Sequence, residues 1–458
     1  MPSNDREYEY VIVGGGPSTR ILNHYLNMAN PDVSVCVIRN EERIANHCSI
    51  PYIIDGTVPL HEGGLTSDRI VTRFGTDLIK EKVISGDAGK KYVTTDAGTQ
   101  IGYEKLVFAT GAEEALPPIP GTDLPGAIKV RDLEDFRTSL DQIEKRQSFV
   151  VLGAGYVGLE IGCALQRSGK EVRVVELLPH IMGNRYDPDS IAPLETTLRE
   201  HGIDLRLGHK AVEVGGDQHV EFLELENGNW IHTDALVLAT GVKPRIGYAE
   251  EFGLETAREG IVVDEYFRTN LPDVYALGDC IQTHSFVTRL PFPGKLGSVA
   301  AQMARTLALN FNGKDIPFEG VLNPACTKLF DLHFCSAGHT EKDARDAEID
   351  VICGKTENTD IYSNMPHNRD VFAKLVFRRD DRTVIGGEMV GAANFAGFAD
   401  CLAQLIHRKA TIEDIATMDV STHPELTPNP AHSYLMFAAQ KVLQDSVNKQ
   451  ELSSNVGF

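Results

Sequence analysis

The stretch SFVVLGAGYVGLE (residues 148–160) decides the fold. An apolar run ends at Leu152, and Gly153, Gly155 and Gly158 follow with the spacing Gly-x-Gly-x-x-Gly before a helical pattern over 159–168. Glycines at this spacing between a strand and a helix let the backbone approach a pyrophosphate at the helix N-terminus. The stretch therefore predicts a strand-helix-strand unit that binds a dinucleotide.

An acidic residue follows this glycine turn at a useful distance. A second apolar run covers 171–175, and Glu176 ends it 23 residues after Gly153. A carboxylate at this point binds the 2′-hydroxyl of a ribose. The next residues, 177–179, include no arginine that would neutralise a 2′-phosphate. The pattern favours NADH over NADPH.

The same pattern occurs near the N-terminus. Residues 10–13 form an apolar run that leads into GGGPST (14–19) and a helical stretch over 20–28, with Thr19 in the third glycine position. Two further phrases are duplicated, KLVFATG (105–111) and ALVLATG (235–241). Duplication of turn and closing strand predicts two related nucleotide-binding domains, each a parallel sheet flanked by helices.

The first domain has no acidic residue directly at the end of its second strand. The strand expected over 33–38 ends in Arg39-Asn40-Glu41-Glu42, so Glu41 is the candidate for an adenosine ribose. Further along the chain, the apolar run at 274–277 is followed directly by Gly278 and Asp279. A Gly-Asp at the end of a strand can place a carboxylate and a backbone N–H on the ribityl and phosphate groups of a flavin.

Composition excludes other classes of protein. The 458 residues are 42% hydrophobic and 24% charged with a net charge of −21, which is typical of a soluble globular protein and repels nucleic acid and anionic membranes. The N-terminus has no signal peptide and no apolar run is long enough to span a bilayer, so we expect a cytoplasmic protein. Eight cysteines without a Cys-x-x-Cys pair indicate reduced thiols and no zinc or other metal site.

These motifs, in this order, resemble the pyridine nucleotide-disulfide oxidoreductase family of FAD flavoproteins. The resemblance implies an α/β fold with two Rossmann-like domains and a C-terminal α+β dimerisation domain, in a homodimer that uses FAD and NADH. The expected division is a FAD domain over 1–120 and 250–322, an NAD domain over 121–249 and a dimerisation domain over 323–458. In that last domain we expect strands at 328–334, 372–377 and 384–390 and helices at 396–408 and 412–418. The expected cofactor-binding residues are Gly14, Gly16, Ser18, Glu41, Val83, Thr110, Gly111, Asp279, Gly153, Gly155, Tyr156, Gly158, Glu160, Glu176 and Gly241.

Cysteine spacing selects a branch of this family. Cys48 is followed by no second cysteine until Cys163, which excludes the dithiol relay of the lipoamide and glutathione reductases. The stretch IANHCSIPY (44–52) resembles the single-cysteine branch of coenzyme A-disulfide reductases, persulfide and polysulfide reductases, NADH oxidases and NADH peroxidases. A cysteine at the start of a helix has a stabilised thiolate, which is the nucleophilic form. We therefore predict that Cys48 is the redox-active residue.

Two histidines are candidate proton carriers. His47, beside Cys48, is a candidate local proton donor or an exposed residue without a task. His423, in STHPELT (421–427), resembles the acid-base histidine that the dithiol branch supplies from the partner subunit, although Pro428 stands where that branch has its orienting glutamate. The single-cysteine branch more often presents a tyrosine from this region, and Tyr434 is nearest.

The preferred function is therefore reduction by NADH of a small disulfide, persulfide or polysulfide, coenzyme A forms included, through FAD and Cys48. Coenzyme A recognition has little support from the first helix, whose corresponding residues, Ile21, Tyr25 and Met28, are mostly apolar. One alternative is an NADH oxidase or peroxidase that forms a Cys48 sulfenate. Pro17 argues against a dedicated peroxidase, because that branch has a histidine there. A second alternative is an electron-transfer reductase for a ferredoxin- or rubredoxin-like protein.

Overall fold

The computed structural model describes residues 6–60, 64–131, 133–183, 185–392 and 395–455. The chain forms two compact units. Unit 1 comprises the described parts of 1–118, 128–145 and 240–321, and unit 2 those of 119–127, 146–239 and 322–458. Residues 128–145 and 240–249 thus belong to the same unit as 1–118, whereas the sequence-based division placed them in the NAD domain.

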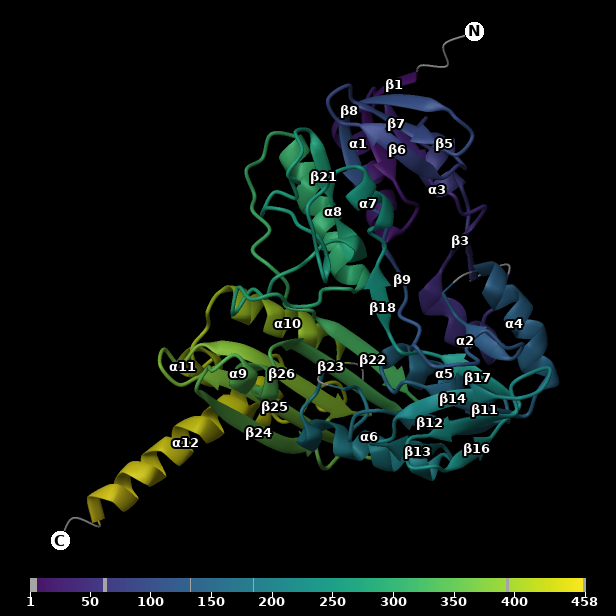
Figure 1. Cartoon of the computed structure of the whole chain (residues 1–458). Helices are drawn as coiled ribbons and strands as arrows, with labels where there is room; N and C mark the ends of the chain where they lie inside the picture. The colour runs from purple at the N-terminus through teal and green to yellow at the C-terminus, as the bar shows by residue number, and fades with distance from the viewer. Residues whose placement is uncertain (1–5, 61–63, 132, 184, 393–394, 456–458) are drawn as a thin grey trace. The chain divides into compact units, whose positions relative to one another are not determined.

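Unit 1 is built on a sheet with the order β5-β2-β1-β8-β7-β6. A seventh strand, β21, pairs with the last residues of β8, whereas β7 pairs with its first residues. The pairs among β5, β2, β1, β8 and β21 are parallel, as in a Rossmann-like domain. Helices α1 and α8 pack against each other beside this sheet (Figure 1). These elements are β1 (Arg6–Val13), α1 (Pro17–Ala29), β2 (Val35–Ile38), β5 (Asp77–Ile79), β6 (Val83–Asp87), β7 (Tyr92–Thr95), β8 (Gln100–Phe108), β21 (Val274–Ala276) and α8 (Gly297–Phe311).

The core of unit 1 explains why these runs form strands. Val11, Ile12 and Val13 are successive residues of β1 and all are buried. A strand that is covered on both faces reads as a continuous apolar run, because helices pack on both sides of a parallel sheet. The carboxyl ends of β1, β2, β8 and β21 therefore meet at one edge, where the turns that follow them gather.

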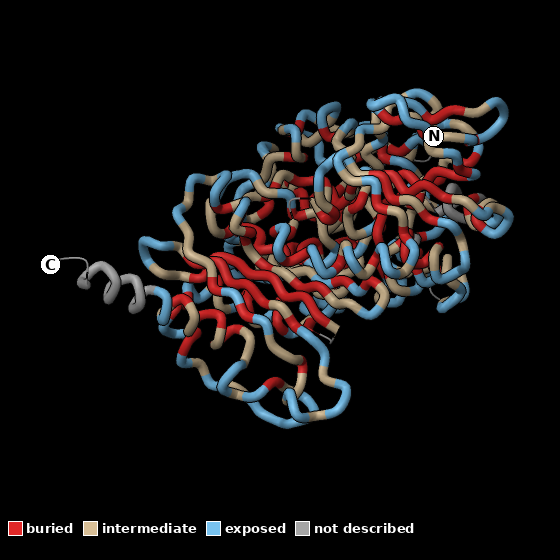
Figure 2. The backbone as a smooth tube through the Cα atoms, turned by 90° about the horizontal axis from the view of Figure 1, so that it is seen from below, coloured by how far each residue is buried: buried red, intermediate tan, exposed pale blue. Residues whose placement is uncertain are grey.

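Unit 2 contains the second parallel sheet, with β17, β11, β12 and β13 in that order. A separate antiparallel sheet of β14, β15 and β16 is formed by the part of the chain between β13 and β17. Figure 2 shows that buried residues are concentrated along the strands. These elements are β11 (Ser148–Leu152), α5 (Tyr156–Arg167), β12 (Glu171–Glu176), α6 (Pro188–Glu200), β13 (Asp204–Leu207), β14 (Ala211–Gly215), β15 (Phe222–Leu225), β16 (Trp230–His232) and β17 (Ala235–Leu238).

The C-terminal part of unit 2 is an α+β domain, as expected. Its antiparallel sheet has the order β22-β23-β26-β25-β24, and helices α9, α10, α11 and α12 accompany it. No described helix is long and apolar enough to cross a bilayer. The elements are β22 (Ala325–Leu329), β23 (Leu332–Gly338), α9 (Glu341–Asp346), β24 (Val351–Thr359), β25 (Asp370–Arg378), β26 (Val384–Gly391), α10 (Ala396–His407), α11 (Ile412–Ala416) and α12 (Tyr434–Asn455).

One expectation for this domain is wrong. The single strand predicted over 328–334 is a hairpin, in which Phe330 and Asp331 form a two-residue turn between β22 and β23. Phe330 has φ 52°, the left-handed conformation that such turns require. One further helix is α4 (Leu133–Lys145). The remaining elements are short: β3 (Ile44–Ala45), η1 (His47–Ser49), α2 (Ile50–Ile54), β4 (Leu65–Thr66), α3 (Arg69–Thr72), β9 (Ala112–Glu114), β10 (Ala127–Lys129), β18 (Val242–Pro244), α7 (Gly247–Glu251), β19 (Thr256–Ala257), β20 (Gly260–Ile261), η3 (Gly278–Cys280) and η4 (Pro430–His432).

Candidate active site

The first glycine turn, at the end of β1, leaves the start of helix α1 open. Gly14 has φ 120°, and a Cβ there would lie 2.2 Å from the carbonyl oxygen of Ala109. Gly16 is the N-cap of α1, makes no side-chain cap, and has open space where a Cβ would point. Thr19, the departure from the usual third glycine, is fully buried and donates its hydroxyl to the Gly14 carbonyl at 2.9 Å. The turn thus keeps the shape of a pyrophosphate cradle.

A cavity of about 900 Å³ lies beside this turn in unit 1. Four of the predicted cofactor residues line it: Gly14, Glu41, Val83 and Thr110. Glu41 pairs with Arg245 at 3.4 Å, and the Thr110 hydroxyl donates to the Arg245 carbonyl at 3.2 Å. The cavity therefore joins the ends of β1, β2 and β8 to the segment that follows Gly241.

Arg39, directly after β2, lines the same cavity. Its side chain is fully buried, and its Nη2 donates to the Asp68 carboxylate and the Glu42 carbonyl. Its Nε and Nη1 are buried without a hydrogen-bond partner among the described residues. Buried guanidinium donors are costly unless they are paired, and a phosphate would pair them. Together with the open turn at Gly16, this fits the pyrophosphate of FAD.

Asp279 lies beside the same helix start. Gly278 has φ 82°, and a Cβ on it would lie 3.2 Å from the Ser18 hydroxyl in the first turn of α1. The Asp279 carboxylate pairs with the Arg131 guanidinium at 3.3 Å, and its carbonyl accepts from the Lys295 ammonium at 3.2 Å. The structure thus brings together Ser18 and Asp279, two predicted cofactor residues that are far apart in the sequence.

Cys48 is exposed and lies in the 3₁₀ turn η1, which runs directly into helix α2. The sequence placed this thiol at a helix start, which the structure confirms. However, α2 has five residues, so its macrodipole is small. The neighbouring side chain, His47, makes a hydrogen bond of 2.7 Å from Nε2 to the Arg131 carbonyl. Cys48 is therefore tied through His47 and Arg131 to Asp279.

The protonation state of His47 follows from these contacts. A carbonyl oxygen only accepts, so Nε2 carries the hydrogen and Nδ1 is left as the atom that can exchange a proton. The ring keeps an exposed surface, yet the surrounding protein atoms desolvate it, which is the main reason that its pKa is lowered from 6.5. The hydrogen bond to the Arg131 carbonyl and the Asp279 charge raise the pKa, the charges of Arg131 and Arg245 lower it, and the net shift is downward. His47 is thus neutral near pH 7 and suited to accept a proton.

In unit 2, the second glycine turn has the same open form. Gly155 caps α5 without a side chain and has open space at its Cβ position, whereas a Cβ on Gly158 would lie 2.0 Å from the Gly153 carbonyl oxygen. Glu176 holds the loops around it, accepting from Ala154 N–H at 2.7 Å and from Leu178 N–H at 2.9 Å. The turn and the acid are therefore next to each other, as dinucleotide binding requires.

Other predicted residues have specific contacts. The Tyr156 and Tyr186 hydroxyls lie 3.1 Å apart, and burial raises the pKa of both. The Glu160 carboxylate accepts from the Thr327 hydroxyl of β22 at 2.6 Å, and burial raises its pKa. Gly111 and Gly241 both have positive φ and lie in unit 1, so Gly241 is not in the unit of the second glycine turn.

His423 lies in an exposed turn of unit 2. Its Nδ1 accepts from the Glu425 N–H at 3.3 Å, and its own N–H donates to the Thr427 hydroxyl at 3.0 Å. Nε2 therefore carries the proton when the ring is neutral. Tyr434 donates to the Thr359 carbonyl at 3.2 Å, and burial raises its pKa, so it is committed to the domain's own packing.

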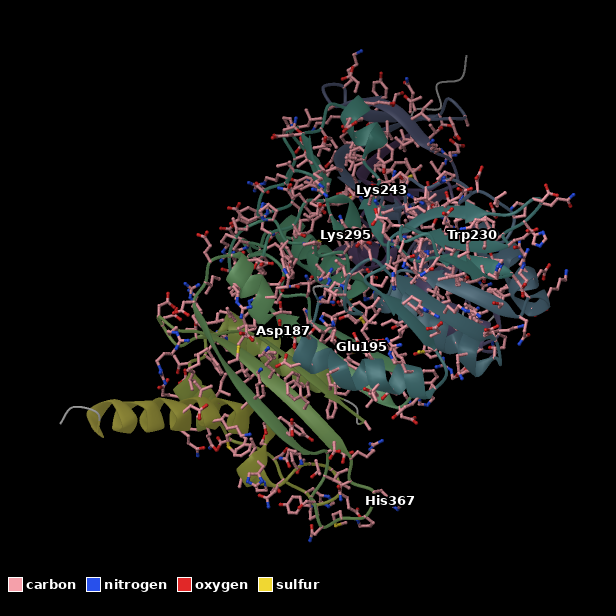
Figure 3. The ribbon with its side chains drawn as sticks, turned by 60° about the horizontal axis from the view of Figure 1, so that its bottom comes forward. Asp187, Glu195, Trp230, Lys243, Lys295 and His367 are labelled. Carbon is pink, nitrogen blue, oxygen red and sulfur yellow. The ribbon has the colours of Figure 1, made fainter. Side chains whose placement is uncertain are left out.

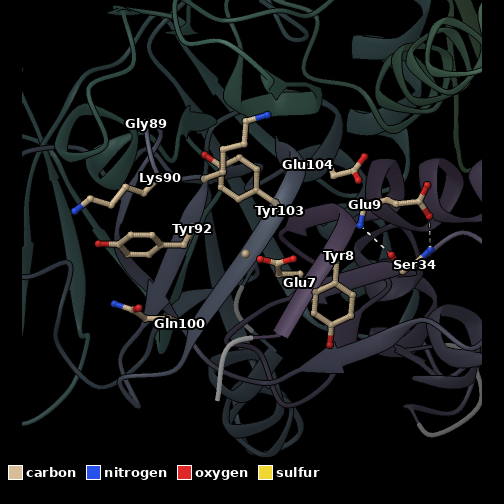
Figure 4. A pocket seen from close by; sticks show the side chains of 12 residues that line it. Glu7, Tyr8, Glu9, Ser34, Gly89, Lys90, Tyr92, Gln100, Tyr103 and Glu104 are labelled. Carbon is tan, nitrogen blue, oxygen red and sulfur yellow. Dashed lines mark hydrogen bonds between the residues drawn. The ribbon is translucent and has the colours of Figure 1, made fainter. Parts of the chain in front are cut away.

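Unit 1 has a second hollow, of about 600 Å³, at the start of the sheet (Figure 4). Tyr8 on β1 and Tyr92, Gln100 and Tyr103 on β7 and β8 are among its lining residues. Tyr8 precedes Gly14 by six residues, about 20 Å along an extended strand. This hollow therefore lies at the opposite edge of the sheet from the glycine turn and contains no predicted site residue.

A buried charge cluster lies between the start of α6 and the C-terminal sheet (Figure 3). Asp187, Asp189 and Glu388 are close enough to hold a metal ion. The ammonium of Lys374, which is 1% exposed, is 2.8 Å from Asp187 and 3.2 Å from Asp189, and 2.9 Å from Glu341. A protein cation already pairs with Asp187, Asp189 and Glu341, so these three carboxylates belong to an ion-pair network, and Glu388 lies beside it.

Sequence reasoning missed three basic residues of unit 1, Arg39, Arg131 and Lys295. Arg39 directly follows the buried strand β2, and Arg131 comes shortly after β10. A charged residue at the carboxyl end of a parallel strand lies at the edge where ligands bind, so this position was a usable signal for Arg39. Lys295 had no such signal, because it lies in an irregular segment before α8.

Known proteins are similar to this chain over nearly its whole length. The chain is 30% identical to an NADH oxidase of Methanocaldococcus jannaschii over 96% of this chain and 99% of that protein. It is 28% identical to an NAD(P)H sulfur oxidoreductase (CoA-dependent) of Pyrococcus furiosus over 91% of this chain and 96% of that one. Among solved structures, the NAD-dependent persulfide reductase of A. fulgidus matches with a TM-score of 0.90 and 27% identity, over 95% of this chain and 83% of that chain.

The family signatures cover both parts of the chain. The signature of pyridine nucleotide-disulphide oxidoreductases matches residues 8–304, and that of their dimerisation domain matches residues 324–433. These ranges include both glycine turns, Cys48 and the α+β domain up to the start of α12. The chain therefore belongs to the pyridine nucleotide-disulphide oxidoreductase family, whose members are FAD-dependent NAD(P)H oxidoreductases.

Proposed function

We propose that this enzyme uses NADH to reduce a small disulfide, persulfide or polysulfide through the single thiol of Cys48. The contact path from Cys48 through His47 and Arg131 to Asp279 carries this proposal. Asp279 adjoins Ser18 at the start of α1 through Gly278, so the path connects the exposed thiol to the place where a flavin would lie. The sulfur-reducing relatives from Pyrococcus furiosus and A. fulgidus support the same assignment.

The residues present fit FAD. Gly14, Gly16 and Arg39 would hold its pyrophosphate. Ser18 and Asp279 would hold the ribityl chain and the phosphate of this pyrophosphate that carries it. When bound, FAD would carry the electron pair of NADH to the sulfur held at Cys48. In unit 2, the turn at 153–158 and Glu176 would hold NADH.

Cys48 forms the covalent intermediate. Its thiolate attacks one sulfur of the substrate, the substrate's S–S bond breaks, and the departing thiolate takes up a proton. Two electrons and a proton then release the second substrate sulfur as a thiol and restore the Cys48 thiolate. His47, neutral with Nδ1 free to exchange a proton, would accept the Cys48 proton before the attack. This differs from the proton-donor role expected from the sequence, because a lowered pKa leaves little protonated His47 near pH 7.

The proposal extends to the assembly. The match to a dimerisation domain supports a homodimer. In such a dimer, His423 remains the candidate proton donor to the released thiolate, with its proton on Nε2. Tyr434 is a weaker candidate, since its hydroxyl is bonded to Thr359 within its own domain.

The proposed sulfur substrates include both coenzyme A disulfide or persulfide and compounds without coenzyme A, such as polysulfide. Ile21 and Tyr25 of α1 are partly buried against the core of unit 1, and the Tyr25 hydroxyl is the one polar side-chain group that this pair could offer to a coenzyme A tail. The CoA-dependent relative from Pyrococcus furiosus nevertheless makes coenzyme A disulfide and persulfide necessary arms of the test.

The test is anaerobic NADH oxidation by the purified FAD enzyme. Substrates are coenzyme A disulfide, coenzyme A persulfide, polysulfide and glutathione disulfide, with Cys48→Ser as the variant and Cys326→Ser, the other exposed cysteine, as the matched control. We expect turnover with at least one sulfur compound, a loss of at least about a hundredfold in Cys48→Ser, and no loss in Cys326→Ser. Equal turnover by Cys48→Ser would refute the role of Cys48.

Two arms separate the alternatives. Rapid NADH consumption with oxygen or peroxide alone, lost in Cys48→Ser, would favour an NADH oxidase or peroxidase, a reading that the Methanocaldococcus jannaschii relative supports. Undiminished reduction of a ferredoxin or rubredoxin by Cys48→Ser would favour an electron-transfer reductase.

A further inference from the structure

The hairpin of β22 and β23 places two cysteines directly opposite each other. Cys326 is the register partner of Cys335, three pairs away from the turn-closing pair of Leu329 and Leu332. A two-residue turn is closed by a hydrogen bond between its flanking residues, so the Leu329–Leu332 pair is hydrogen-bonded. Hydrogen-bonded and non-hydrogen-bonded pairs alternate along an antiparallel ladder. Cys326 and Cys335 therefore form a non-hydrogen-bonded pair.

This type of pair has the right spacing for a disulfide. Its Cα atoms lie about 4.5 Å apart and its side chains point to the same face of the sheet. Disulfides span Cα separations of about 4.4–6.8 Å, so the two strands would need little movement.

The two thiols differ in access. Cys326 is exposed, whereas Cys335 is 1% exposed. Burial raises the pKa of both, that of Cys335 to about 12, and the Asp400 carboxylate of α10 raises both further. An oxidant in solution therefore meets Cys326 first, and Cys335 is placed to react only with a sulfur already attached to Cys326.

We propose that Cys326 and Cys335 form a reversible disulfide across the hairpin by exchange with a low-molecular-weight disulfide. Cys326 thiolate attacks the small disulfide, whose S–S bond breaks and releases one thiol with a proton. Cys335 thiolate then attacks the Cys326 sulfur and displaces the second small thiol. Two protein thiols are oxidised and one small disulfide is reduced to two thiols. This modification site is separate from Cys48 and does not depend on the proposed reduction of sulfur compounds.

Peptide mapping of the full-length FAD enzyme tests this proposal. The enzyme is incubated with glutathione disulfide, free thiols are alkylated, and a tryptic digest is analysed without reduction. Cleavage after Lys314, Lys328 and Lys342 separates the two cysteines into peptides 315–328 and 329–342. We expect these two peptides to appear as one linked species that dithiothreitol separates. Because exchange needs the thiolate, it should be about tenfold slower at pH 7.5 than at pH 8.5.

Variants identify the pairing. The linked species should persist in Cys48→Ser and in Cys401→Ser, which removes a cysteine of α10, and should disappear in Cys335→Ser, where Cys326 should instead retain glutathione. A Cys326–glutathione adduct in the wild-type enzyme without linked peptides would overturn the proposal, as would a link from Cys326 to Cys401.

Discussion

Glu388 offers a stability test that can be worked out from the structure. This carboxyl group is 1% exposed, and it accepts from the Asp187 N–H at 2.8 Å and from the Ser190 hydroxyl. Desolvation, and secondly the nearby Asp187 charge, raise its pKa from 4.5 to about 8. The folded protein therefore holds a proton on Glu388 that the unfolded chain has already lost near pH 7.

The sign of the pH dependence follows. Between about pH 4.5 and 8, the folded state binds more protons than the unfolded state, so the free energy of unfolding falls as pH rises. The shift of 3.5 pKa units corresponds to about 5 kcal/mol, lost at up to about 1.4 kcal/mol per pH unit. Glu388→Gln resembles the protonated acid and cannot ionise, so this part of the loss should vanish.

The assay is urea unfolding at several pH values between 5 and 9, followed by the fluorescence of Trp230. This is the single tryptophan of the chain and lies in unit 2 with Glu388. We expect the difference in unfolding free energy between Glu388→Gln and wild type to increase in favour of the variant by about 4 kcal/mol across this range, since the rest of the 5 kcal/mol arises below pH 5. The exposed Glu357→Gln on β24 is the matched control and should follow wild type. Parallel curves for wild type and Glu388→Gln would refute the reasoning.

Three further results are expected. Arg39→Met should release FAD about 10- to 100-fold more readily, measured as flavin fluorescence on dilution, because two buried donors to the pyrophosphate are lost; unchanged retention would contradict this. Glu176→Gln should reduce the NADH over NADPH ratio of kcat/KM by about tenfold, since the carboxylate repels a 2′-phosphate; an unchanged ratio would argue against this contact. In wild type, kcat/KM should fall as pH drops through the pKa of His47, which lies below 6.5, and His47→Gln should remove this fall. If kcat/KM of the variant still falls in the same way, the titrating group is a residue other than His47.

The parallel sheets were the most predictable part of the fold. The strand expected at 148–152 has those bounds in the structure, and the strand expected before the second Ala-Thr-Gly phrase covers 235–238, because a strand buried on both faces is a continuous apolar run that ends where the polar turn begins. The helices begin earlier than expected, α1 at Pro17 and α5 at Tyr156, since the last residues of each glycine turn are already helical. Proline is well suited to the first helical position, so Pro17 was a signal for this start.

The hairpin at 330–331 was less visible because Phe330 and Asp331 lack the Asn-Gly signature of such turns. A signal existed in the phase of the pattern. In a single strand with one buried face, the apolar residues occupy alternate positions. Leu329 is at an odd-numbered position, whereas Leu332 and Phe334 are at even-numbered positions, so these three residues do not lie on one face of a single strand. The contacts of Arg131 and Lys295 with Asp279 were beyond sequence reasoning, since they join segments that only the folded chain brings together.

The two nucleotide-binding units share a topology but differ in the charge at the end of the second strand, and this difference fits different parts of a dinucleotide. Glu176 is an acceptor that is already bonded to two backbone N–H groups, and its remaining lone pairs suit ribose hydroxyls. Arg39 offers only donors, two of them buried and unpaired, which suit phosphate oxygens. In unit 1, the ribose ligand that we propose is Glu41, whose carboxylate is partly neutralised by Arg245. The first site should therefore hold its cofactor mainly through the pyrophosphate, and FAD release should respond more strongly to Arg39→Met than to Glu41→Gln.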